Sequence, residues 1–509
     1  MTKPSLKPLT TGITLLAALA YLAVGMGRGL YPYDEGIIAH GAERVLAGAV
    51  PYLDFWSAYS PGQFYLLAGL YKVFGPGLMV GRIYTLAAEF AIVVFAFLLS
   101  RRFSARTGSL VACALVAIWL GYAGRPLYPA IPAMALALAG FCLIGRPSIS
   151  FHALAGMMAG GALLLRHDLG VYALPPQLLA IAAYAWLDPH AQKDTHPPFA
   201  RVFRLLLAYA AGASLFVLPA TVAIFSKVPF GLLHEIFIIF PLRDYAKIRA
   251  LPAPPPGLDV ESLACLLPFV LVGAAVLAVL FSLGRRHTLP GYSGAAGLTL
   301  FGLALLLTAR VRPDVEHMAA PMIAVLIVLP WVIGRLHPAA GALLILPCIL
   351  LFLQCLLGKV ILSSLPTRPV HLERAAGIYV GFEPDGLEEA VRYIRRNTTD
   401  GERIFVGNAR HDRIFINHAL FYFLSGRTSA TRCHELLPGV ATTAAMQHEI
   451  VSEIQRYRVR YIVLWLAPQG HEPNQSSETG ATVLDDWIRS HCKEVGRFGD
   501  FAILRRVGT

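Results

Sequence analysis

Long apolar segments recur along this chain and stop near residue 365. A helix that crosses the hydrocarbon layer of a membrane needs about 20 mostly apolar residues, and about eleven segments approach that length. They are 10–27, 82–100, 107–122, 129–145, 152–165, 170–187, 204–225, 262–283, 290–309, 318–335 and 339–358. Backbone polar groups in hydrocarbon must bond to one another, so the pattern predicts a bundle of transmembrane helices. Segment 152–165 is too short to cross alone unless it belongs to a broken helix or lies beside a cavity.

The composition agrees with a multi-spanning membrane protein. Hydrophobic residues make up 56% of the 509 residues and charged residues only 15%, whereas a soluble protein carries about a quarter charged residues. The net charge is +12. No basic run with interleaved aromatic residues accompanies this charge, so we expect no nucleic acid partner. Anionic membrane lipid or a phosphorylated substrate accounts better for the surplus.

The loops indicate an orientation. Lys3 and Lys7 precede the first apolar segment and no small-residue cleavage site follows it, so we expect a retained first span with a cytoplasmic N-terminus. An odd number of spans then places the C-terminal region outside. A count of basic residues alone does not decide the orientation, because both sets of loops carry them. The outer loops also carry most of the acidic residues, and they are therefore the expected location of a site.

Two outer segments and the C-terminal region lie outside the spans. The first outer loop, 28–81, contains amphipathic stretches at 36–48 and 61–74, which we place in the plane of the membrane surface. A second long outer segment, 227–261, contains a proline-rich stretch at 252–256 that cannot be helical.

From residue 366 the composition changes to that of a small soluble domain. The pattern predicts helices at 386–397, 449–457 and 482–491 and strands at 403–406, 461–466 and 501–504. We therefore expect an α-helical multi-span membrane domain (1–365) followed by an extracytoplasmic α/β domain (366–509). No glycine-rich phosphate loop lies between the strands, so no cofactor is assigned. Cys433 and Cys492 could form a disulfide outside the cytoplasm, and the sequence leaves their pairing open.

Two adjacent carboxylates, Asp34 and Glu35, follow the first apolar segment. Ionisable groups at a lipid boundary are costly and usually serve function. An ionised carboxylate that faces water can act as a general base toward an attacking hydroxyl or amine. The structural alternative is a helix cap with a salt bridge. Asp54 is a weaker candidate, whose aromatic neighbours suit either a sugar or a membrane-interface belt.

Two charged turns and one lysine are further candidates for substrate binding. Arg166, His167 and Asp168 end the short apolar segment, which indicates either a broken helix beside a cavity or a simple interfacial loop.

Arg310 and Arg312 follow another span and suit a phosphate, since each guanidinium can fork onto its oxygens; local ion pairs at a span end are the alternative. His317 lies in the same loop, and the histidines are too dispersed to form a zinc site. Lys72, at the charged end of the stretch 61–74, could contact a phosphate or simply extend to the membrane surface.

The order of these features resembles the GT-C lipid-linked glycosyltransferases. A span, an outer acidic pair and an interface helix precede PYLDFWSAYSPGQFYLLAGLYKVFGPG and then VGRIYTLAAEF…LLSRR. The pattern is similar to the branch that contains protein mannosyltransferases and the aminoarabinose transferase of lipid A. The resemblance covers residues 10–190 in motif detail and the remainder in general layout.

This resemblance implies a polyprenyl-phosphate sugar as donor, a reaction on the outer side of the membrane and a lipid, glycan or protein acceptor. It implies a multi-pass protein, which we expect in a bacterial inner (plasma) membrane. It places the first-loop acidic residue of the family on Asp34, with Glu35 as its neighbour, and a lipid-phosphate contact on Lys72. Arg166 falls at a charged turn of the family, where the pair His167–Asp168 departs from the usual sequence.

The implied mechanism is an inverting displacement at the anomeric carbon. Asp34 takes the proton of the acceptor, while Lys72, Arg310 and Arg312 stabilise the leaving phosphate. No nucleotide or metal is required, although a divalent ion is left open. A transporter or flippase of lipid-linked sugars is the main alternative, because broken spans and charges at depth would also serve transport. A membrane-anchored sensing or scaffold protein is a third reading, which leaves the first-loop carboxylates unexplained.

Overall fold

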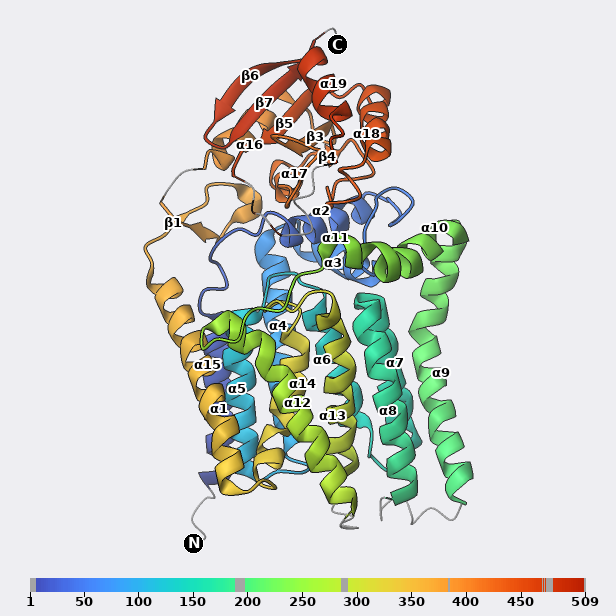
Figure 1. Ribbon diagram of the computed structural model, residues 1–509. Coiled ribbons are helices and arrows are strands. Elements are labelled where there is room, and N and C mark those ends of the chain that lie inside the picture. Colours follow the sequence, from blue (N-terminus) through green and yellow to red (C-terminus); the bar gives the residue numbers. More distant parts are fainter. Residues whose placement is uncertain are drawn as a thin grey trace.

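The protein consists of a helical bundle with a C-terminal mixed β-sheet domain at one end (Figure 1). The computed structural model describes residues 6–187, 197–284, 292–382, 385–468, 470, 472 and 479–507. Within this part of the chain, seven helices are long and apolar enough to cross a membrane: α4 (Leu78–Ser100), α5 (Arg106–Ala123), α8 (His167–Leu187), α9 (Pro198–Phe225), α12 (Val260–Gly284), α13 with the following 3₁₀ turn η3 (Tyr292–Arg310) and α15 (Pro338–Ser364). Four shorter apolar helices accompany them: α1 (Leu6–Ala23), α6 (Ala130–Leu143), α7 (Ile149–Leu165) and α14 (Ala319–Ile333). Each overlaps one predicted segment, so the predicted fold class is confirmed.

The predicted short segment is helix α7, and a single residue separates it from α8. That residue, Arg166, has an extended backbone (φ −153°, ψ 104°). The chain reverses here, and the two helices pack side by side. Gly170 permits their close approach, because a Cβ atom at this position would lie 2.6 Å from the backbone of Leu163. The charged turn 166–168 therefore lies at the end of the bundle that faces the C-terminal domain.

A layer of short helices lies between the bundle and the C-terminal domain (Figure 1). It contains α2 (Asp34–Leu46), α3 (Pro61–Phe74), α10 (Phe230–His234), the π-helical segment η2 (Glu235–Asp244) and α11 (Tyr245–Arg249). Helices α2 and α3 coincide with the two amphipathic stretches expected in the first outer loop. The proline-rich stretch 252–256 is not helical, as its prolines require.

The C-terminal domain contains a five-stranded mixed sheet with the strand order β4–β3–β5–β7–β6. The strands are β3 (Arg403–Asn408), β4 (Thr428–Ser429), β5 (Tyr461–Trp465), β6 (Cys492–Phe498) and β7 (Phe501–Arg506), and a separate pair joins β1 (Arg368–Pro369) to β2 (Tyr379–Val380). Strand β3 runs parallel to β4 and β5, whereas β7 runs antiparallel to β5 and β6. The helices are α16 (Leu387–Asn397), α17 (Leu420–Ser425), α18 (Ala444–Arg456) and α19 (Val483–His491), with a 3₁₀ turn η4 (Glu373–Ala375). Cys433 and Cys492 are both buried free thiols.

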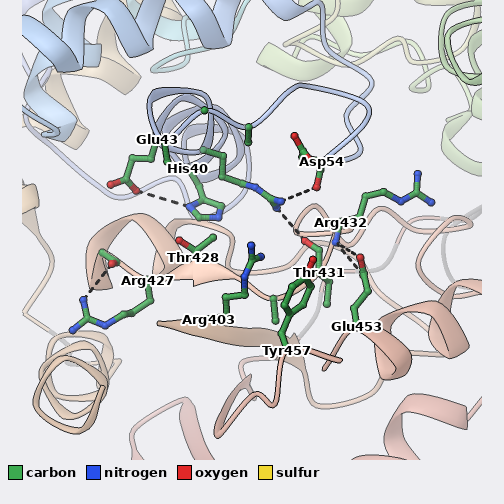
Figure 2. A pocket seen from close by; sticks show the side chains of 16 residues that line it. His40, Glu43, Asp54, Arg403, Arg427, Thr428, Thr431, Arg432, Glu453 and Tyr457 are labelled. Atoms are coloured by element: carbon green, nitrogen blue, oxygen red, sulfur yellow. Dashed lines mark hydrogen bonds and ion pairs between the residues drawn. The ribbon is translucent and has the colours of Figure 1, made fainter. Parts of the chain in front are cut away.

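Helices α2 and α3 share one hydrophobic core with the C-terminal domain. Ile38 of α2 and Phe64 of α3 are fully buried in a cluster that also contains Leu420 and Phe421 of α17. A pocket of about 440 Å³ remains at the edge of this contact, between the end of α2 and the strands β3 and β4 (Figure 2).

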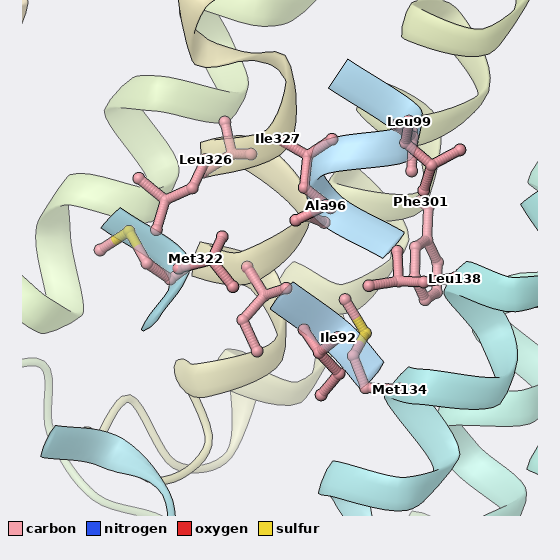
Figure 3. Close-up of a cluster of buried hydrophobic side chains, with 14 of the residues drawn as sticks. Ile92, Ala96, Leu99, Met134, Leu138, Phe301, Met322, Leu326 and Ile327 are labelled. Atoms are coloured by element: carbon pink, nitrogen blue, oxygen red, sulfur yellow. The ribbon is translucent and has the colours of Figure 1, made fainter. Parts of the chain in front are cut away.

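A second, larger core holds the bundle together. Figure 3 shows side chains of α4, α6, α13 and α14 meeting at its centre: Ile92, Ala96, Leu99, Met134, Leu138, Phe301, Met322, Leu326 and Ile327. Helix α14 is buried on nearly all its faces, which is the pattern of a central helix. The outer helices α9 and α15 instead leave long apolar side chains exposed, such as Leu218 and Leu346. This surface is suited to lipid.

The close contact between α2 and α17 gives a first testable prediction. A Cβ atom on Gly36 would lie 2.1 Å from the backbone nitrogen of Leu420, so Gly36→Ala must push the two helices apart. We expect a loss of about 1–3 kcal/mol, as for other overpacked cores, seen as a lower thermal unfolding temperature in detergent. Gly69→Ala in α3 is the matched control, because nothing lies within 4 Å of that position. Equal shifts for the two variants would contradict the packing described here.

Candidate functional site

The carboxylate of Asp34 lies in the first turn of α2, at the domain end of the bundle. The phenol of Tyr59, in the loop before α3, donates a hydrogen bond of 2.9 Å to Asp34 Oδ1. Burial raises the pKa of Asp34 above its ordinary value, while this hydrogen bond and the positive charge of Arg249 act in the opposite direction. A fixed carboxylate whose pKa is shifted toward neutrality is the usual arrangement for a general base.

Glu35 has a different environment from its neighbour. Arg82 of α4 donates to both of its carboxylate oxygens, each at 2.7 Å, and both side chains are buried. The same guanidinium donates to the backbone carbonyls of Met26, Arg28 and Gly29. Both carboxylate oxygens of Glu35 are thus engaged by one partner, Arg82. We therefore assign Glu35 a positioning role. It fixes the start of α2, and therefore Asp34, relative to α4.

The charged turn between α7 and α8 lies against the loop that carries Tyr59. Asp168 accepts from Nε and Nη2 of Arg166, at 3.0 and 3.3 Å. The Arg166 guanidinium also lies over the ring of Tyr128, 4.9 Å from its centre. The backbone nitrogen of His167 donates to Ser60 Oγ at 2.8 Å, and His167 Nδ1 lies 3.1 Å from the same hydroxyl. The turn is therefore tied directly to the loop that orients Asp34.

Arg312 is engaged by carboxylates. Its Nε donates to Asp314 and its two Nη atoms fork onto Glu472 of the C-terminal domain, at 2.9, 2.9 and 2.8 Å. Asp314 also accepts from the backbone and Nδ1 of His317, and the opposite ring nitrogen of His317 lies 3.5 Å from the hydroxyl of Tyr245. The predicted pair of phosphate-binding arginines is thus separated, because Arg310 is exposed and Arg312 is buried in ion pairs.

Lys72 and Asp54 are not brought into contact with Asp34. Lys72 is exposed beside the exposed side chains of Val73 and Phe74, an environment that suits contact with the membrane surface. Asp54 accepts from the backbone nitrogen of Val50 at 2.6 Å and lines the pocket at the other end of α2.

Several residues near Asp34 were not predicted from the sequence. Tyr33 donates to Glu435, whose pKa burial raises to about 8, and the two residues are 402 positions apart. Arg249 ends α11, and its buried Nη1 makes no hydrogen bond within the described residues, with Glu472 4.0 Å away. No local spacing could have indicated these contacts. Tyr59 alone had a signal, since it lies inside the motif quoted above, YSPGQF.

A second pocket, of about 820 Å³, opens between α1, α4, α5 and α15. The ion pair of Arg125 and Glu316 lines its domain end, and Glu89 and Lys359 line it further along the helices. The negative charge of Glu316 also raises the pKa of Asp34.

Within the described residues, no group of three or more His, Cys, Asp and Glu side chains is arranged to hold a metal ion. The expectation of a reaction without a metal stays a prediction.

Comparison with known proteins identifies the fold. The chain is similar to the mycobacterial arabinofuranosyltransferase AftD, with a TM-score of 0.53 and 13% identity over 99% of this chain and 40% of AftD. The oligosaccharyltransferase AglB of Archaeoglobus fulgidus, solved with an inhibitory peptide and a dolichol-phosphate, aligns at a TM-score of 0.49 and 13% identity over 91% of this chain and 70% of AglB. A scan of protein-family models and a search of curated proteins gave no match. The fold of this chain is therefore similar to that of AftD. The chain spans less than half of AftD, with which it shares this architecture.

Proposed function

We propose that this protein is a membrane glycosyltransferase that transfers a sugar from a polyprenyl-phosphate carrier to an acceptor, with Asp34 as the general base. The observation that carries the proposal is the carboxylate of Asp34, oriented by Tyr59 at the domain end of a GT-C-like bundle. The proposal places this end of the bundle on the extracytoplasmic side, with the N-terminus in the cytoplasm.

Each charged group has a role in the proposed displacement. Asp34 accepts the proton of the acceptor hydroxyl or amine as that group attacks the anomeric carbon. Negative charge then grows on the departing phosphate. Arg249, whose charge acts on Asp34, and Arg166, whose charge acts on Tyr59, can stabilise it. His317 adds a hydrogen-bonding group held by Asp314. Arg312 is paired with Glu472 of the C-terminal domain. Its role is to hold this domain against the bundle, and it does not contact the phosphate.

The pocket between α1, α4, α5 and α15 suits the entry of a lipid-linked substrate. Its apolar wall lies along the helices, and its domain end carries the cations Arg28 and Arg125. A polyprenyl chain would remain among the helices, and these cations would attract its phosphate before it reaches Arg166 and Arg249. Lys72 and Arg310, both exposed, would contact membrane phosphates nearby.

Transfer of a labelled sugar tests the proposal directly. Purified full-length protein in detergent is given polyprenyl phosphates that carry different labelled sugars, together with lipid, glycan and peptide acceptors. Movement of the label to an acceptor supports the proposal. The competing flippase function is tested in vesicles that carry the same donor on one side. Movement of the donor between leaflets, with no sugar transfer in any assay, would overturn the proposed glycosyltransferase function.

The pH dependence of transfer gives a second test. Tyr59→Phe removes the hydrogen bond that lowers the pKa of Asp34, so that only the positive charges of Arg249 and His317 still oppose the effect of burial. With a higher pKa, Asp34 becomes protonated at a higher pH when the solution is acidified. We therefore expect the acid limb of the pH–rate profile to shift to higher pH. Tyr65→Phe, on the exposed face of α3, is the control and should leave the profile in place. Coincident profiles for both variants would exclude this role of Tyr59.

A further inference from the structure

The pocket at the far end of α2 is lined by four arginines, of which two have no carboxylate partner among the residues that the structure describes. Arg427 bonds to Asp400, and Arg432 bonds to Glu449 through two hydrogen bonds. Arg44 of α2 instead donates to the backbone carbonyls of Thr431 and Asp54.

Arg403 of β3 is the second arginine without a carboxylate. It donates to the carbonyl of Ser429 and lies over the ring of Tyr457, 4.1 Å from its centre. Within the described residues, no carboxylate oxygen lies within ion-pair distance of Arg44 or Arg403. Figure 2 shows Arg403 reaching across the pocket toward the helix that carries His40 and Glu43.

These two guanidiniums repel each other. The positive charge of Arg403, together with burial, lowers the pKa of Arg44 to about 10. Two like charges held in a partly desolvated pocket destabilise the folded chain unless a counter-charge is present.

The carboxylates of the same pocket supply counter-charge to Arg44 only from beyond ion-pair distance. Both oxygens of Glu453 accept from the backbone nitrogen of Arg432. Glu43 is paired with Arg374, and Asp54 accepts from the backbone nitrogen of Val50. Asp54 and Glu453 still act on Arg44 by their charge, but within the described residues neither forms an ion pair with Arg44 or Arg403, so both guanidiniums can receive an anion.

We propose that this pocket binds an anionic saccharide, whose phosphate or carboxylate is held between Arg44 of α2 and Arg403 of β3. Guanidiniums suit both groups, because each can donate two parallel hydrogen bonds. The volume of about 440 Å³ exceeds that of a bare oxyanion and accommodates a sugar. The remaining wall is polar and includes Thr428 and Thr431, which suits hydroxyl groups better than an apolar body.

The site is separate from the proposed transfer reaction, yet it is built on the same helix. Asp34 lies in the first turn of α2 and Arg44 in its last turn. A bound anion would bridge α2 to the sheet of the C-terminal domain and hold the two together.

Titration calorimetry of the full-length protein in detergent tests this site without turnover. The probes are inorganic phosphate, glucose 1-phosphate, glucuronate and, as the uncharged reference, glucose. We expect saturable binding of the three anions, tighter for the two anionic sugars than for phosphate, and no binding of glucose. Equal affinity for phosphate and glucose 1-phosphate would overturn the saccharide part of the proposal. Dissociation constants well above about 1 mM for all three anions would overturn the whole proposal.

Variants at Arg403 locate the binding. Arg403→Gln should weaken binding of the anions about tenfold or more, since each hydrogen bond to a charged group contributes about 1.5–3 kcal/mol. Arg403→Lys retains the charge and should bind with intermediate affinity, which keeps the test valid if the glutamine variant misfolds. Arg396→Gln, at an exposed arginine of α16, is the matched control. Unchanged affinity in both Arg403 variants would exclude this pocket.

Discussion

Asp34→Asn should reduce sugar transfer by about 10²–10⁴-fold, the usual contribution of a general base. Asparagine has nearly the same shape and can still accept the hydrogen bond from Tyr59. It cannot, however, take a proton from the acceptor. The loss should therefore appear in kcat, with little change in KM for the donor, in assays of labelled-sugar transfer by the purified protein.

The stability of the same variant distinguishes a catalytic role from a structural one. Burial raises the pKa of Asp34, which means that the folded protein disfavours the ionised form at this position. Replacement by a neutral amide should therefore leave the thermal unfolding temperature unchanged or raise it. A variant that loses activity only in proportion to lost folded protein would exclude Asp34 as the base.

Substitutions that break the ion pair between Glu35 and Arg82 should give the largest loss of folding free energy. Both side chains are buried, so Glu35→Gln leaves a buried guanidinium without its counter-charge. Breaking such a pair costs about 3–5 kcal/mol, which we expect as a marked fall in unfolding temperature and in the yield of monodisperse protein. Arg82→Met should cost at least as much, because the carbonyls of Met26 and Gly29 also lose their donor.

Two controls show whether burial causes this loss. Arg125→Gln breaks the half-exposed pair with Glu316 and should cost only about 0–1 kcal/mol. The double variant Glu35→Gln/Arg82→Met removes both buried charges, so it should be more stable than the sum of the single losses predicts. Strictly additive losses would mean that the two side chains do not form the pair described here.

The sequence was sufficient for those parts of the fold that depend on local pattern. Apolar length predicted the bundle helices, and the charged turn after segment 152–165 is the reversal between α7 and α8. Helix α17 and strand β6 were missed. Helix α17 has six residues that are all buried, and so short an apolar run has no period to distinguish a helix from a strand.

The candidate site was predictable only in part, because its contacts join distant segments. Asp34 and the turn at Arg166 had local signals in their charge and position. The partner of Tyr33 lies 402 residues away and that of Arg312 lies 160 residues away. Such pairs depend on how the domain packs on the bundle. Spacing of Arg310 and Arg312 suggested a shared phosphate, but local turn geometry exposes one arginine and buries the other.

The core shared by α2, α3 and the C-terminal sheet sets a rule for recombining this protein with its structural relatives. A cut at residue 365 would separate Leu420 and Phe421 from Ile38 and Phe64, and each fragment would then expose an apolar face prone to aggregation. A chimaera that exchanges the C-terminal domain must therefore exchange residues 28–81 with it. The unit that can be transplanted is discontinuous in the chain, and it includes Asp34, the proposed general base.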